Sequence, residues 1–393
     1  MTAVDPADAD LHDVILVGGG LASCLALLAL AAARPAARVL IVERADALGG
    51  NHTWCFHADD VPPELADVLA PALAHRWPGY EVAFPEHARS LASPYACATS
   101  ASLAAAVHAA VAAHPSYAVR LGTAVQEIGT SYVVLASGER LRARRVVDAR
   151  GPAHLATDPA ACGYQKFVGL ELALSSPHGL DRPMLMDATV PQRDGFRFVY
   201  VLPLAERRVL VEDTYFSDTP DLPRAELESG ILAYAAARGW QTAGVLREER
   251  GVLPLPLEMP TAPRALGDGP LVAGYQGGWF HPTTGYSMPL ALRVAQFIAH
   301  GADEPDAAAS WQLLVDDHRR QLAFALRLNK MLFRWFAPDQ RHHVLARFYR
   351  APEDTVRRFY ALRTTRSDRA RILCGRPPRG MSWRAVLTGQ RVA

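Results

Sequence analysis

The sequence predicts an α/β domain joined to a β-sheet region and a helical C-terminal region. Three observations predict it: a strand, a glycine turn and a helix near the N-terminus; alternating β-type patterns between about residues 163 and 255; and helical, Arg-rich patterns after residue 305. The chain has 393 residues, more than twice a usual domain of roughly 150, so several modules are expected. Half of the residues are hydrophobic, which supports large cores.

The chain opens with a strand, a glycine turn and a helix. The apolar run that ends at Val17 is followed by the spacing Gly18-x-Gly20-x-x-Ser23 and by a Leu- and Ala-rich segment. The first glycine permits a tight turn, the second lets the backbone approach a pyrophosphate, and a small third residue lets the helix pack closely. A second strand ends at Glu43, where an acid accepts hydrogen bonds from a ribose. Together these features predict a dinucleotide site, although the glycines alone fit a structural turn equally well.

Later glycine segments favour FAD over NAD. Two glycines shortly after Glu43 resemble the extended fingerprint of FAD-binding oxidoreductases of the glutathione-reductase type. A strand ending at Asp148 runs into a glycine turn, and one ending near Gly274 leads through a glycine-rich loop into a helix, as in flavin hydroxylases of the para-hydroxybenzoate hydroxylase type. Tyr275 stands where that type has an acid, so ribose contact there would fall to the backbone. The predicted cofactor-binding residues are Gly18, Gly20, Ser23, Glu43, Gly49, Gly50, Asp148, Gly151, Gly274, Thr284 and Gly285.

An aromatic strand lies in the β-rich middle of the chain. Phe196, Phe198 and Tyr200 occupy every second position, which places the three rings on one face of a strand. An ordinary core strand and a wall for a long apolar ligand both fit this pattern.

Carboxyl groups in neighbouring strands are candidates for acid–base chemistry. Alternation places Glu212 on one face of its strand and Asp213 on the other, so the two enter different environments. A carboxyl group buried among apolar groups has a raised pKa and can act as a general acid near neutral pH, whereas one in water or paired with Arg is structural. Glu171 is a further carboxyl group within an apolar run.

Several other kinds of site find no support in the sequence. The five Cys residues form no Cys-x-x-Cys pair and their number is odd, which indicates a reducing compartment and no disulfide framework. No metal site is predicted, because neither His-Glu-x-x-His nor a Cys/His cluster occurs; P-loop and nucleophile-elbow motifs are absent as well. The uncharged segment 14–33 contains three glycines and follows acidic residues, so we expect neither a signal peptide nor a transmembrane helix.

Basic residues gather near the C-terminus. Between Arg319 and Arg384, sixteen Arg and one Lys stand against four acids, although the whole chain has a net charge of only +1. A surface for anionic lipid, a nucleic-acid surface and a solvated helical face all fit this asymmetry. No nucleic-acid motif accompanies the charge, so a nucleic-acid partner is not expected.

Longer strings give the chain a family resemblance. Residues 49–57 (GGNHTWCFH), 186–190 (MDATV), 211–214 (VEDT) and 280–287 (FHPTTGYS) resemble the bacterial lycopene β-cyclases, and the similarity covers nearly the whole chain. The resemblance implies a flavoprotein that needs reduced FAD yet performs no net redox reaction, with NAD(P)H as an external reductant. Such an isomerase, an intramolecular lyase, converts lycopene to β-carotene through γ-carotene. The family's essential acid matches Glu212, and Asp213 and Glu171 are further catalytic candidates.

The chemistry of ring closure requires a proton donor and groups that stabilise a cation. A terminal alkene is a poor base, so the donor must be a protonated acid in a dry pocket, and we expect Glu212 to be that donor. Aromatic faces and a reduced flavin suit the ring cation because they stabilise its charge without trapping it. The predicted substrate-lining residues are Phe196, Phe198, Tyr200, Trp279, Phe280 and His281.

The expected domains combine these segments. Residues 1–60, 96–160 and 256–305 are predicted to form a discontinuous FAD-binding domain, residues 61–95 and 161–255 a substrate-binding domain, and residues 306–393 a basic helical region that docks on a membrane. Because lycopene is insoluble in water, the resemblance implies a cytoplasmic enzyme held peripherally on the inner face of the cell membrane. The oligomeric state stays open, as do two other functions: an FAD-dependent reductase or hydroxylase acting on an isoprenoid, and a non-catalytic isoprenoid-binding protein with a flavin fold.

Overall fold

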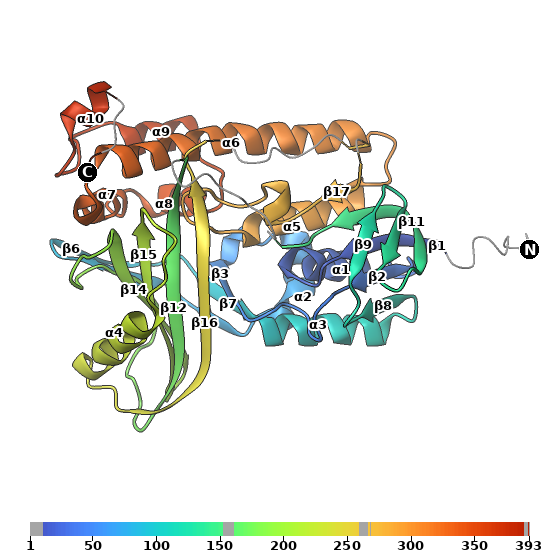
Figure 1. Cartoon of the computed structure of the whole chain (residues 1–393), viewed down its shortest axis with the longest axis horizontal. Coiled ribbons are helices and arrows are strands. Elements are labelled where there is room, and N and C mark those ends of the chain that lie inside the picture. Colours follow the sequence, from blue (N-terminus) through green and yellow to red (C-terminus); the bar gives the residue numbers. More distant parts are fainter. Residues whose placement is uncertain (1–10, 152–160, 259–265, 268, 389–391, 393) are drawn as a thin grey trace, which may run out of the picture.

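The structure is a computed structural model that describes residues 11–151, 161–258, 266–267, 269–388 and 392. Figure 1 shows an α/β part beside a β-rich part with long strands, and C-terminal helices that run along both. This is the combination of layers that the sequence predicts.

The α/β part is built on a seven-stranded sheet. Its strands are β1 (Leu11–Val17), β2 (Val39–Val42), β8 (Tyr117–Arg120), β9 (Val125–Ile128), β10 (Tyr132–Leu135), β11 (Arg140–Asp148) and β17 (Leu271–Val272). The order is β8-β2-β1-β11-β10-β9, and β17 also pairs with β11. β1, β2, β8, β11 and β17 pair in parallel, so their carboxyl ends meet at one edge. The uncharged segment after residue 14 is therefore a buried strand, a turn and the helix α1 (Leu21–Ala33).

A second seven-stranded sheet forms the β-rich part. Its strands are β5 (Tyr80–Phe84), β6 (His87–Leu91), β12 (Cys162–Leu174), β13 (Met184–Asp187), β14 (Phe196–Ala205), β15 (Arg208–Ser217) and β16 (Thr242–Pro256). The order is β16-β12-β15-β14-β13-β5-β6, and β12, β14, β15 and β16 run antiparallel to their neighbours in this order. The long central strands carry the side chains of greatest interest for function.

The two faces of this second sheet are covered differently. On one face, Val199, Val211 and Leu170 pack against helix α4 (Arg224–Ala237) and its Ile231. On the other face, aromatic residues including Phe196 pack toward the C-terminal helices. Both faces are therefore buried, and a polar side chain on either face needs a partner.

Smaller elements join the two large sheets. A three-stranded sheet contains β3 (Thr53–His57), β7 (Tyr95–Thr99) and β4 (His75–Trp77), in the order β3-β7-β4. Four short helices connect β3 to β4: η2 (Ala58–Asp60), η3 (Pro63–Leu65), α2 (Ala66–Leu69) and η4 (Ala70–Ala72). Helix α3 (Ser100–Ala113) follows β7 and packs on α1.

The C-terminal part is helical, as the sequence predicts. A short turn η6 (Tyr275–Gly277) precedes α5 (Met288–Gln296), which packs on α1 and runs into a π-helical turn, η7 (Phe297–Gly301). The remaining helices are α6 (Ala307–Trp335), η8 (Pro338–Gln340), α7 (His342–Phe348), α8 (Glu353–Tyr360), α9 (Arg366–Leu373) and α10 (Trp383–Thr388). Figure 1 shows that α6 spans the length of the molecule along one side.

A buried arginine connects these helices to the second sheet through hydrogen bonds. Arg341, just before α7, is fully buried, and its guanidinium group bonds both carboxylate oxygens of Asp218 at 2.7 and 2.9 Å. It also donates to the Phe216 carbonyl oxygen at 3.2 Å and lies over the Phe333 ring, 4.6 Å from its centre. A charge this deep is stable only with its partners in place.

Replacing Arg341 with Ala should therefore lower the free energy of unfolding by about 3–5 kcal/mol, because it removes a large, fully buried side chain together with its bonds to Asp218 and to the Phe216 carbonyl oxygen. Denaturant unfolding of both proteins measures the difference. Arg327→Ala removes an exposed arginine from α6 and should change stability little. Equal losses in the two variants would contradict the connecting role of Arg341.

Candidate active site

Glu212 lies at the centre of the second sheet, on the face turned away from α4. In the antiparallel pairs, Glu212 of β15 is directly opposite Tyr200 of β14 and Gly169 of β12. Directly opposed residues point to the same face, so the Glu212 side chain shares a face with the Tyr200 ring. Its side chain is partly buried, so the sheet alone does not cover the carboxyl group.

The surroundings of Glu212 favour its neutral form. Burial, and next the negative charge of Glu249, raise the pKa of the Glu212 carboxyl group to about 8. The Thr214 hydroxyl donates to Glu212 Oε1 at 2.6 Å and opposes this rise. Glu212 is therefore protonated at neutral pH, as a general acid must be.

Glu249 of β16 approaches Glu212 across a glycine. Gly169 of the intervening strand β12 is directly opposite both residues. A Cβ atom added to Gly169 would lie 3.1 Å from Glu249 Cγ and 3.5 Å from Glu212 Cβ. A larger residue on β12 would therefore fill the space between the two carboxyl groups.

Arg247 and Thr53 hold Glu249 in place. Arg247 Nη1 donates to Glu249 Oε2 at 2.6 Å, and the Thr53 hydroxyl donates to the same oxygen at 3.0 Å. Arg247 Nη2 in turn donates to Thr53 Oγ1 at 2.8 Å. Burial raises the pKa of Glu249, and the positive charge of Arg247 opposes the rise, as it does for Glu212.

Asp213 and Glu171, the two further catalytic candidates, are both held by arginines. Asp213 lies on the α4 face and is 1% exposed; its two oxygens bond Arg197 Nε and Nη2 at 2.8 and 2.9 Å. Glu171 shares the Glu212 face, where it accepts from Arg208 and, at 3.1 Å, from Arg247 Nε. The structure thus separates Asp213 from Glu212 and places Glu171 in the network around Arg247.

Aromatic side chains continue the Glu212 face. The Phe196 and Phe198 rings stack with centres 5.1 Å apart, and Tyr200 follows on the same strand. The Tyr200 hydroxyl lies 3.4 Å from that of Tyr95, which lies 3.5 Å from that of Tyr286. Three phenols, from β14, β7 and the loop before α5, therefore form a row that begins at Tyr200, directly opposite Glu212.

Trp279 and His281, two more of the predicted lining residues, contact the C-terminal helices. Trp279 is fully buried, stacks on His318 with ring centres 4.6 Å apart and donates to the Val272 carbonyl oxygen. His281 accepts from the Thr283 amide at Nδ1, which leaves Nε2 to donate to the Phe359 carbonyl oxygen at 3.0 Å. These contacts connect the loop to α6 and α8, so a role in lining the substrate site stays a prediction for both residues.

The glycines near the carboxyl end of β1 leave space for a cofactor. A Cβ atom on Gly20 would have no atom of the described residues within 4 Å, and one on Gly274 would meet only Ala22 Cβ, at 3.7 Å. Gly18 has φ +99°, and a Cβ there would lie 2.8 Å from the Ala149 carbonyl oxygen. This loop combines the tight turn and the open backbone that a pyrophosphate needs.

Glu43 and the glycines after it support the same loop. The Glu43 carboxylate accepts from the Gly19 amide and, at 2.7 Å, from the Ala45 amide, at the carboxyl end of β2. Gly49 has φ +78° and its amide donates to the Gly19 carbonyl oxygen at 2.8 Å; Gly50 has φ +64°. Their positive φ angles favour glycine at both positions.

Two further predicted positions lie in or beside this region. Ser23 is fully buried in α1, and its hydroxyl has no hydrogen-bond partner among the described residues. A Cβ atom on Gly151 would meet no atom of the described residues within 4 Å. The open space at Gly151 fits a bound group, whereas the full burial of Ser23 fits the close helix packing expected of a small residue at that position.

Asp148, another predicted cofactor-binding residue, forms hydrogen bonds within the protein. Both Asp148 oxygens bond Arg150, at 2.9 and 2.8 Å, and the Gln276 amide lies 3.5 Å away. Tyr275, at the position of the missing acid, stacks on Phe280 with ring centres 4.3 Å apart.

The Tyr275 hydroxyl closes the loop over residues 275–286. It donates to the Gly285 carbonyl oxygen, while Thr284 Oγ1 accepts from the Tyr286 amide at 3.4 Å. Gly285 has φ +67°, which favours glycine there. Tyr275 thus stabilises the loop from within, so a ribose contact at this position would fall to the backbone.

Four residues of this site were not predicted from the sequence: Glu249, Arg247, Tyr95 and Tyr286. The one local signal is the charged run from Arg247 to Arg250 inside the predicted β-rich region, where strand alternation would put Arg247 and Glu249 on one face. Placing Glu249 beside Glu212 also requires the register of β16 and β15 on β12, which no local pattern contains.

Replacing Glu249 with Gln removes the negative charge next to Glu212, so the pKa of Glu212 should fall by about one unit, or about 1.4 kcal/mol. Infrared difference spectra across a pH titration follow the carboxylic acid C=O stretch of Glu212, which Glu212→Gln identifies by its loss. Glu248→Gln, the same change on the opposite face of β16, should leave this titration unchanged. An identical Glu212 titration in the parent and in Glu249→Gln would contradict the pairing.

Comparison with solved structures places the fold among flavoproteins. A geranylgeranyl bacteriochlorophyll reductase-like protein from Thermoplasma acidophilum superposes with a TM-score of 0.61 at 14% identity, covering 93% of this chain and 96% of that one. A probable FAD-dependent monooxygenase from Pseudomonas aeruginosa gives 0.56 at 19% identity, covering 80% and 96%. The chain therefore has an FAD-binding oxidoreductase fold.

Sequence comparison identifies the family. The family model described as lycopene cyclase protein matches residues 13–386. A lycopene beta-cyclase of Pseudescherichia vulneris is 42% identical, covering 96% of this chain and 97% of that protein. With matches of this extent, the chain belongs to the lycopene cyclase family.

Proposed function

We propose that this protein is a lycopene β-cyclase that closes the ψ-ends of lycopene into β-ionone rings, giving β-carotene through γ-carotene. The observation that carries the proposal is a carboxyl group with a raised pKa, Glu212, on an aromatic face of the sheet. The relatives named as lycopene beta-cyclases support the substrate. An FAD-dependent redox enzyme and a non-catalytic isoprenoid binder fit the fold but give no use to a protonated acid at this position.

Glu212 starts the reaction by donating its proton to the terminal alkene. The neighbouring double bond then attacks the resulting cation, and the new ring carries the positive charge. Tyr200, Phe198 and Phe196 offer π faces, which stabilise a cation without forming a bond to it. Glu212, now a carboxylate, is a base that can take up the proton that the ring cation loses.

The interaction between Glu212 and Glu249 lets Glu212 give up and regain its proton near neutral pH. Glu249, held by Arg247, remains beside Glu212 and disfavours a second negative charge there. The carboxylate that remains after donation is therefore a stronger base than an isolated glutamate.

Gly18, Gly20, Glu43 and Gly274 would hold FAD along the carboxyl edge of the first sheet. Reduced FAD, when bound, supplies an electron-rich ring system that stabilises nearby positive charge. NAD(P)H is the proposed external reductant.

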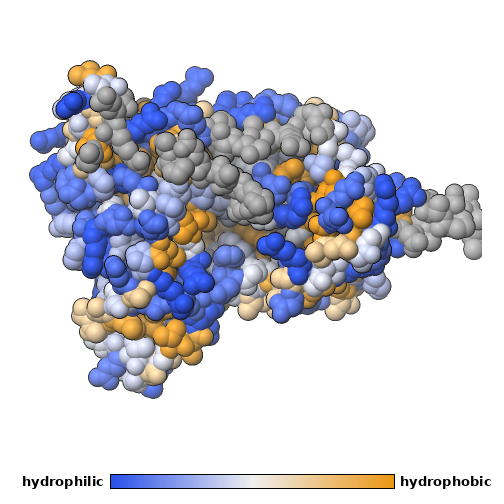
Figure 2. Space-filling view, in the orientation of Figure 1, coloured by the Kyte–Doolittle hydropathy of each residue, from blue (hydrophilic) through white to orange (hydrophobic). Residues whose placement is uncertain are grey.

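Membrane docking would give the enzyme access to a substrate that is insoluble in water. No helix within the described residues combines the length and the apolar character that crossing a membrane requires. Trp383 and Leu387, one turn apart on α10, are 62% and 85% exposed, and basic residues accompany them in this region. Figure 2 shows apolar residues exposed among hydrophilic ones over α10. These features support peripheral docking on the inner face of the cell membrane through the C-terminal helices.

Glu212→Gln keeps the shape of the side chain but removes its acidic proton, so β-carotene formation from lycopene should fall by about 10²–10⁴-fold. Pigment analysis of a lycopene-accumulating host, together with FAD content of the purified protein, measures the effect. Glu248→Gln makes the same substitution on the other face of the sheet and should retain turnover. Parent-level turnover in Glu212→Gln would overturn the assignment.

When the reaction runs in deuterated water, the product should contain deuterium, because the added proton comes from an exchangeable carboxyl group. Mass spectrometry measures the deuterium content of β-carotene, and a parallel assay measures the NADPH consumed per product molecule. The proposal expects deuterium in the product and no stoichiometric NADPH consumption. One NADPH consumed for each product molecule would instead indicate a reductase.

A further inference from the structure

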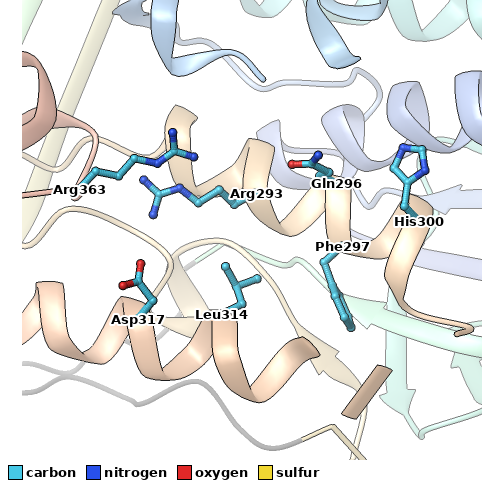
Figure 3. A pocket seen from close by; sticks show the side chains of 7 residues that line it. All are labelled: Arg293, Gln296, Phe297, His300, Leu314, Asp317 and Arg363. Carbon is cyan, nitrogen blue, oxygen red and sulfur yellow. The ribbon is translucent and has the colours of Figure 1, made fainter. Parts of the chain in front are cut away.

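A cavity lies away from Glu212 and from the glycine loop. It has a volume of about 480 Å³ and opens between α5, η7, α6 and the turn after α8. Figure 3 shows Arg293 and Arg363 extending toward each other at one end, with the Asp317 carboxylate directed toward them. Leu314 and Phe297 line the apolar side. None of these residues belongs to the site described above.

Among the described residues, neither guanidinium group has a carboxylate within ion-pair distance, although the buried Asp60 carboxyl group interacts electrostatically with both. Asp317 is instead 3.3 Å from Arg320. Arg293 Nη2 donates to the Ala361 carbonyl oxygen, but its Nε is buried without a hydrogen-bond partner. The cavity therefore brings two positive charges together and leaves donors unused, which is the arrangement that an anion completes.

The turn that carries Arg363 is fixed by packing. Leu362 has φ +49°, a conformation that leucine rarely adopts, and its side chain is 2% exposed. The Arg363 amide donates to the Arg358 carbonyl oxygen at 2.8 Å, and Arg293 bonds the Ala361 carbonyl oxygen. The protein thus maintains a disfavoured backbone that holds Arg363 opposite Arg293.

The lining also restricts the chemistry of the anion. Among the lining residues, two guanidinium groups and one carboxylate leave a single positive charge, which matches a phosphodiester. Asp60 also interacts with both arginines, and burial raises the pKa of its carboxyl group to about 7. Asp317 can accept a hydrogen bond from a hydroxyl or ammonium group next to the phosphate, and Leu314 and Phe297 can contact the adjoining carbons. Leu313, on the same turn of α6, is 71% exposed and available to an apolar layer.

We propose that this cavity binds the phosphodiester headgroup of a membrane phospholipid, with the phosphate between Arg293 and Arg363 and the headgroup hydroxyl or ammonium on Asp317. The proposal rests on the membrane docking proposed above and adds a specific lipid site to it. Leu313 enters the apolar layer beside the bound headgroup.

Binding of monomeric dihexanoyl-phosphatidylglycerol, followed by calorimetry, tests the cavity without a bilayer. The parent should bind one molecule saturably, and Arg363→Gln should bind about fivefold more weakly or not at all. Arg363→Lys, which keeps the charge, should recover part of the loss. Arg327→Gln removes an exposed charge of α6 outside the cavity and should bind like the parent. Equal losses in Arg363→Gln and Arg327→Gln would overturn the site.

Flotation with phosphatidylcholine vesicles containing phosphatidylglycerol separates this proposal from membrane docking in general. A parent that floats but does not bind the short-chain lipid retains docking and overturns the cavity, whereas a parent that does neither overturns both. Inorganic phosphate that competes as strongly as the lipid would show a site for free phosphate and contradict the lipid assignment.

Discussion

The proposed chemistry of this protein depends on two carboxyl groups that share one face of a sheet with a glycine between them. Glu212 and Glu249 come from strands on either side of β12, and Gly169 leaves the space through which their charges interact. Two guanidinium groups, Arg247 and Arg208, face three carboxyl groups, Glu171, Glu249 and Glu212, so one carboxyl group lacks a compensating charge. Glu212 therefore keeps its proton at a pH where an isolated glutamate has lost it.

The rest of the fold protects this arrangement. Helix α4 and the Arg197–Asp213 pair occupy the opposite face, so the adjacent acid of the same strand is neutralised where it cannot disturb Glu212. The small sheet brings Thr53 and Tyr95 over the Glu212 face, and the loop before α5 adds Tyr286. An FAD-binding fold thus supplies the frame, while its second sheet carries the carboxyl groups to which we assign the acid chemistry.

Local patterns were sufficient to predict much of this structure. The glycine spacing predicted the loop after β1, and two-residue alternation separated Glu212 from Asp213 and placed Phe196, Phe198 and Tyr200 together on one face. That this is the Glu212 face follows from the register of β14 on β15. Glu249 could not be predicted in the same way, because its position depends on strand register between distant segments. The packing of Trp279 on His318 could not be predicted either, because it follows from the path of α6. Tyr275 replaced an expected acid, and only the structure showed its hydroxyl bonded to the Gly285 carbonyl oxygen.

The central claim is that a protonated Glu212 drives ring closure, and the pH dependence of the parent enzyme tests it most directly. Initial rates of β-carotene formation, measured with saturating reduced FAD, should be high below a pH of about 8 and fall as the pH rises through that value, because Glu212 then loses the proton it must donate. A rate that stays constant on both sides of this pKa would contradict the account.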